Sequence, residues 1–299
     1  MTTTATAGAV YDRGYRPYDG PRGGRNAARY ALYRASIRRA LGIRRSWRQK
    51  VAPFVLLGIV TIPAIITVGV AYITRDQVNR QFQIITYREY VGVSSALLLF
   101  VALTAPDIIC PDRRQHVLPL LFARPLTGID YMLAKVGALF SILFLFSFLP
   151  QVVLFVGQAL VSDSALDYTL DNLDVLWMVP VAVAVLAFYY ASIGIAIASL
   201  CNRRIVAGAS LIGLFLVSSV TSAVLVGDIE GEATGSAAAL LDILVIPLYL
   251  RDVIFLGVQS SDSQLRGVEN GGFYAYVVYV VVVATAFGVL LRRYRWTER

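Results

Sequence analysis

Six long stretches of the chain contain no Asp, Glu, Lys or Arg, and they dominate its pattern of apolar and polar positions. They are 17 to 28 residues long and cover 51–74, 90–106, 136–162, 175–202, 205–227 and 270–291. A helix needs roughly 20 residues to cross the hydrocarbon core of a bilayer, and it satisfies its own backbone hydrogen bonds there. The pattern predicts an all-α integral membrane protein with six membrane-spanning helices, at about 51–74, 90–110, 133–161, 175–201, 205–227 and 272–291.

The distribution of charge predicts the orientation of these helices. Of the 27 Lys and Arg residues, 22 lie before the first span, in 107–135, at 203–204 or after the last span, whereas acidic residues gather in the other connections. Basic residues favour the cytoplasmic side of a membrane, so both termini are expected there. The net charge of +8 on 299 residues is then a consequence of topology and of attraction to anionic lipids, and it gives no reason to expect nucleic-acid binding.

The predicted organisation has four parts. Residues 1–50 form a cytoplasmic tail and helix, 51–292 form the six-span domain, and 293–299 form a cytoplasmic tail. The outer segment 228–269 is apolar but interrupted by Asp242, Pro247 and an Arg–Asp pair. We therefore expect a pair of short re-entrant or interfacial helices there rather than a seventh span.

The segment 26–50 has the pattern of a helix that lies on the inner membrane face. Its apolar stripe recurs at helical spacing and consists of Tyr30, Tyr33, Ile37 and Leu41. Arg34 and Arg38 lie beside the stripe, where they could reach lipid phosphates, and Arg39 lies on the opposite side. A basic helix that is merely solvated is the alternative.

The sequence lacks the residues of several kinds of active site. A phosphate-binding loop needs a lysine directly after a glycine, but the only lysines, Lys50 and Lys135, follow Gln49 and Ala134. His116 is the single histidine, which makes zinc catalysis and a serine–histidine–aspartate triad improbable. We expect no catalytic site and no bound cofactor or metal. The spans also lack the charged residues that ion-coupled carriers use.

The connection between spans two and three has a structure of its own. Pro119 fits the first turn of a short helix at 118–124, and Pro125 ends that helix. Thr127 and Asp130 have the spacing of a capping box that opens span three. The short helix carries three apolar side chains on one face: Leu118, Leu121 and Phe122. Three arginines flank it: Arg113, Arg114 and Arg124.

These residues resemble the permease family of type-2 ABC exporters. The resemblance covers about 25 residues, namely Asp112, Arg113, Arg114, Leu118-Pro119-Leu120-Leu121, Ala123-Arg124-Pro125-Leu126, Asp130-Tyr131 and Lys135. The six-span order, the N-terminal helix and the apolar insertion before span six are similar to the family over nearly the whole length. An N-terminal YDGPR unit resembles an actinobacterial subgroup, which implies a bacterial plasma membrane.

The resemblance implies a division of labour between subunits. Residues 112–126 would be a coupling helix, with Asp112, Arg113, Arg114, Leu118, Leu121, Phe122, Arg124 and Pro125 docking on a separate ATPase. Two such ATPases would bind ATP and Mg, and a second copy or a sister permease would complete the transporter. The cargo would be a lipid, a drug-like compound or another amphipathic molecule. The alternatives are an ATP-independent channel or carrier, and a membrane scaffold that transports nothing.

Overall fold

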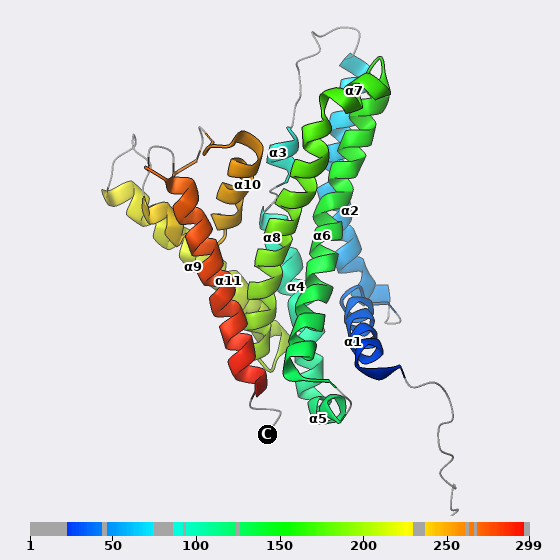
Figure 1. The fold of residues 1–299 in the computed structure, drawn as a ribbon, viewed down its shortest axis with the longest axis vertical. Helices are drawn as coiled ribbons and strands as arrows, with labels where there is room; N and C mark the ends of the chain where they lie inside the picture. Colours follow the sequence, from blue (N-terminus) through cyan, green and yellow to red (C-terminus); the bar gives the residue numbers. More distant parts are fainter. Residues whose placement is uncertain are drawn as a thin grey trace, which may run out of the picture.

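The computed structural model describes residues 23–43, 47–74, 86–91, 94–123, 126–229, 237–260, 263–265 and 268–295, and these are helical with no strands (Figure 1). The elements are α1 (Gly24–Ala40), α2 (Trp47–Thr74), α3 (Tyr87–Tyr90), α4 (Ser94–Arg114), α5 (Leu118–Phe122), α6 (Gly128–Val161), α7 (Ala165–Asp171), α8 (Leu173–Leu200), α9 (Arg204–Ile229), η1 (Ala237–Leu241), α10 (Ile246–Leu256) and α11 (Gly271–Arg295).

Five described helices are long and apolar enough to cross a membrane, so the chain is a multi-pass membrane protein. They are Pro53–Thr74, Gly128–Val161, Leu173–Leu200, Arg204–Gly227 and Gly271–Arg295. The predicted span at 90–110 corresponds to α4, which is not among the five. Four charged residues occupy the last eight positions of α4, and they shorten its apolar part. A sixth span therefore remains a prediction.

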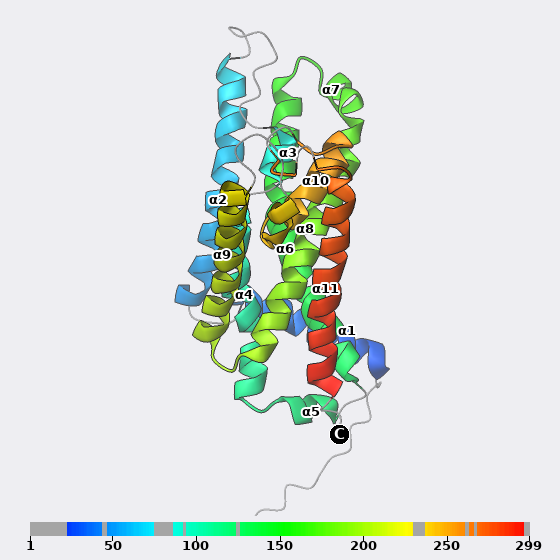
Figure 2. The same cartoon turned by 90° about the vertical axis from the view of Figure 1, so that its left-hand side faces the viewer.

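The helices form an upright bundle around α8 (Figures 1 and 2). In α8, 72% of the most apolar window is buried inside the bundle, compared with 17% in α2 and in α11. The outer surfaces of α2, α9 and α11 therefore remain for lipid or for another chain. Helices α1 and α5 and the end of α11 lie together at one end of the bundle, and α7 lies at the opposite end. We call the first of these the arginine-rich end.

The predicted helix at 26–50 is wrong in its extent. Helix α1 ends at Ala40, and Trp47 already belongs to α2. The cause is Gly42, which adopts a left-handed backbone conformation with φ of 65°. Its N–H bonds to the Arg39 carbonyl at 3.1 Å and the Ile43 N–H to the Arg38 carbonyl at 2.9 Å, which is the Schellman pattern that ends a helix.

The face that α1 buries also differs from the prediction. Leu32, Ser36 and Ala40 are buried, and α1 packs against α6 and α4 near the arginine-rich end. Tyr33, Ile37 and Leu41 of the predicted stripe pack partly against this core. Tyr30 points outward and is 63% exposed. The apolar stripe is thus shared between the bundle and the surface.

The segment before α11 contains two short helices, η1 and α10, in its described part, and their re-entrant or interfacial position stays a prediction. Tyr189 and Tyr190 of α8 donate to the carbonyls of Ile243 and Leu244 at 2.9 and 2.7 Å, between η1 and α10. Asp242 accepts from Ser219 of α9 at 2.7 Å. These bonds fix the chain between η1 and α10 against the bundle.

Candidate functional site

Polar side chains converge at the arginine-rich end, and a buried ion cluster lies at their centre. Asp112, near the end of α4, forms an ion pair with Lys135 of α6 at 2.6 Å and accepts a hydrogen bond from Tyr131 at 3.0 Å. Arg39 of α1 pairs with the other carboxylate oxygen. The side chains of Asp112 and Lys135 are only 3% and 2% exposed. Three helices thus meet on one carboxylate.

A second carboxylate joins α1 to the start of α6. Asp130 completes the predicted capping box with Thr127. It also accepts hydrogen bonds from Arg25 and Arg29, each at 2.7 Å. The hydrogen bond to Asp130 raises the pKa of Arg25 above its usual value. Asp130 therefore caps α6 and binds α1 at the same time.

Two further arginines brace the tight turn between α8 and α9. Arg113 donates to the carbonyl of Ser199, and to that of Cys201 at 3.2 Å. These are terminal carbonyls of α8, which lack partners within the helix. Arg204, the first residue of α9, pairs with Asp107 of α4 at 2.8 Å. The end of α4 therefore holds both sides of the turn.

Helix α5 lies between the Asp112 cluster at the end of α4 and the Asp130 cap at the start of α6. Pro119 occupies its first turn, as predicted. Leu118, Leu121 and Phe122 pack against the bundle core, and the Phe122 ring meets Tyr131 at 6.2 Å between centroids. The outward side instead carries Pro119, Leu120 and Ala123, with Leu120 71% exposed.

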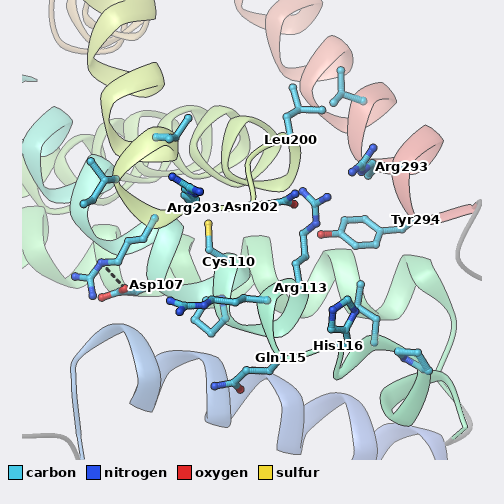
Figure 3. Close-up of a pocket in the computed structure, with 18 of the residues that line it drawn as sticks. Asp107, Cys110, Arg113, Gln115, His116, Leu200, Asn202, Arg203, Arg293 and Tyr294 are labelled. Carbon is cyan, nitrogen blue, oxygen red and sulfur yellow. Dashed lines mark ion pairs between the residues drawn. The ribbon is translucent and has the colours of Figure 1, made fainter.

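A cavity of about 2210 Å³ opens beside this cluster, between the end of α4, the α8–α9 turn and the end of α11 (Figure 3). It is lined by six arginines: Arg113, Arg114, Arg203, Arg204, Arg292 and Arg293. The single histidine, His116, also lines it, and among the residues that the structure describes Asp107 is its one acidic lining residue. We call this cavity the arginine groove.

The structure places some of the residues expected to contact an ATPase inside the bundle and others on its surface. Asp112 and Arg113 face inward and hold helices together, whereas Arg114 is exposed. Leu118, Leu121 and Phe122 also turn toward the bundle. Arg124 and Pro125 lie outside the described residues. Of the arginines in the surface-helix prediction, Arg34 is exposed and Arg38 is half-buried, and their contact with lipid stays a prediction.

Most of the buried cluster differs from what the sequence pattern predicts. Arg39 was assigned to the side away from the apolar stripe, but that side faces Asp112. Arg25, Arg29 and Asp130 form a second contact that no motif indicated. An available signal was Lys135, since a lysine on an otherwise apolar helix needs a buried partner.

The described residues contain no group of three or more His, Cys, Asp or Glu side chains that could hold a metal ion. Cys110 and Cys201 are free thiols at adjacent helix ends. A comparison with protein-family models and with curated proteins finds no match to the chain.

Proposed function

We propose that the chain is the transmembrane permease subunit of an ABC exporter and that α5 transmits the force of a separate ATPase. The observation that carries the proposal is the placement of α5. It is a rigid helix with a proline in its first turn, and its apolar outward side lies at the arginine-rich end between α4 and α6. An ordinary connection between two helices would need no such element.

The contacts around α5 support a mechanical role. The helix before it ends in the Asp112 cluster, and the helix after it begins at the Asp130 cap. Both anchors also hold α1. A displacement of α5 would therefore move α1, α4 and α6 together instead of being absorbed by a flexible loop.

The proposal assigns the chemistry to the partner. Two ATPase subunits would bind ATP and Mg and would dock on the exposed side of α5 from the cytoplasm, which places the arginine-rich end inside. A second permease copy or a sister permease would complete the transporter. The scarcity of charged residues within the spans favours a lipid or another amphipathic cargo for export across a bacterial plasma membrane.

Co-purification of ATPase activity with the tagged chain from its own membranes tests this proposal. Leu120→Asp puts a charge on the outward side of α5, and Leu166→Asp is the matched control because Leu166 is equally exposed, at 77%, on α7 at the opposite end. We expect ATPase activity to accompany the native chain and the Leu166 variant, but not the Leu120 variant.

Two results would contradict the proposal. If no ATPase accompanies the native chain after mild extraction, the ABC assignment is wrong. If both variants retain the ATPase equally, the enzyme docks elsewhere and α5 is not the coupling element. Variants at Leu121 or Phe122 are less informative, because those side chains pack against the core and their loss would disturb the fold.

A further inference from the structure

The arginine groove is lined by more arginines than the described residues of the bundle pair with. Arg113 donates hydrogen bonds to backbone carbonyls, and Arg204 forms an ion pair with Asp107. Arg114, Arg203, Arg292 and Arg293 form no ion pair with another described residue, and all four are exposed. They come from three different elements: α4, the α8–α9 turn and α11. Because they face one cavity, their positive potentials add there.

The groove also has an apolar wall. Leu200, Ile205, Val206 and Val289 line it together with the arginines. Leu200 and Ile205 are 56% and 85% exposed, and Ile205 begins the apolar part of α9. The wall is therefore continuous with the exposed apolar surface of α9, and the arginines lie at the end of that surface.

This combination selects a ligand that is anionic at one end and apolar at the other. Guanidinium groups match phosphate oxygens with paired hydrogen bonds. A free phosphate compound would leave the aliphatic wall in water. The volume of about 2210 Å³ also exceeds the roughly 300–1,000 Å³ that is typical of a small-molecule site.

We propose that the arginine groove binds the phosphate-bearing headgroup of an anionic membrane lipid, with the acyl chains against Leu200, Ile205 and Val206. Arg203 lies at the α8–α9 turn and Arg293 on α11, so they belong to different walls of the groove (Figure 3). The proposal concerns the chain itself and does not depend on an ATPase. Failure to co-purify an ATPase would leave it standing.

Native mass spectrometry of the purified full-length chain in detergent tests the proposal. Phosphatidylglycerol and phosphatidylcholine with the same acyl chains are titrated separately. The variants are Arg203→Gln/Arg293→Gln and, as a control, Arg75→Gln/Arg80→Gln, which removes the same charge at positions that follow α2 in the sequence and do not line the groove. We expect the native chain to retain phosphatidylglycerol preferentially and the groove variant to bind it about tenfold more weakly.

Three outcomes distinguish the site from its alternatives. The control should change affinity by about twofold or less, and Arg203→Lys/Arg293→Lys should recover part of the binding because the charge is restored. Equal loss in the groove and control variants would show diffuse attraction and would overturn the proposal. Displacement of the lipid by equimolar glycerol 1-phosphate would show that a soluble phosphate compound is the ligand, which also overturns it.

Discussion

Replacement of Asp112 by alanine tests whether the buried ion cluster acts as a unit. The substitution leaves Lys135 almost fully buried, with a hydrogen bond to the Ile108 carbonyl at 3.0 Å as its remaining contact of this kind. Breaking a buried ion pair by removing one partner costs about 3–5 kcal/mol, because the other charge is left uncompensated. Arg39 is 29% exposed, so water stabilises part of its charge. We therefore expect a loss near the lower limit, about 3 kcal/mol.

The opposite substitution should cost less. In Lys135→Met, Asp112 keeps Arg39 and the Tyr131 hydroxyl as partners, and methionine occupies a similar volume. We expect a loss of about 1–2 kcal/mol. In the double variant no buried ammonium remains without a partner. Its loss should therefore be smaller than the sum of the two single losses by more than about 1 kcal/mol.

Reversible unfolding in mixed micelles, followed by circular dichroism, measures the free energy of unfolding of the four proteins. Co-migration with the native chain on size-exclusion chromatography shows that each variant starts from the same folded state. Two results would refute the reasoning: a loss below about 1 kcal/mol for Asp112→Ala, or losses that add within about 0.5 kcal/mol.

Two further substitutions test local structure by the same unfolding measurement. Thr127→Ala removes the side-chain oxygen that accepts from the Asp130 N–H, and it should lower the free energy of unfolding by about 1 kcal/mol; no change would mean that the cap contributes nothing. Gly208→Ala places a Cβ 2.9 Å from the backbone oxygen of Ala102, so it should separate α4 from α9 and cost about 1–3 kcal/mol. Gly213→Ala meets nothing within 4 Å and should not destabilise; equal effects at both glycines would exclude the close contact.

The sequence predicted the spans well where the bilayer alone determines them. The five confirmed helices follow the charge-free stretches, because hydrocarbon tolerates little else over that length. The capping box at Thr127 was also predicted, since its signal is local. The end of α1 was not predicted, although the left-handed conformation of Gly42 produces it. The apolar spacing continues through Leu41, and periodicity alone does not show a left-handed turn.

The orientation of short elements could not be predicted from the sequence. Helix α5 has apolar residues on both sides, so its pattern does not say whether Leu120 or Leu121 faces the bundle. The ion cluster has a different difficulty. Arg39 and Asp112 are 73 positions apart, and Arg25 and Asp130 are 105 apart. No periodic signal in a single sequence joins residues at such separations.

The two carboxylate anchors explain why a short helix could act on the whole arginine-rich end. Asp112 lies six positions before Leu118, the first residue of α5, and Asp130 lies eight positions after its last, Phe122. Each carboxylate also binds arginines of α1. If α5 is displaced, these ion pairs must move with it or break. On the proposed function, we expect α1, α4 and α6 to shift together with α5. Because Arg113 ties α4 to the end of α8, the same shift would reach the α8–α9 turn and change the width of the arginine groove.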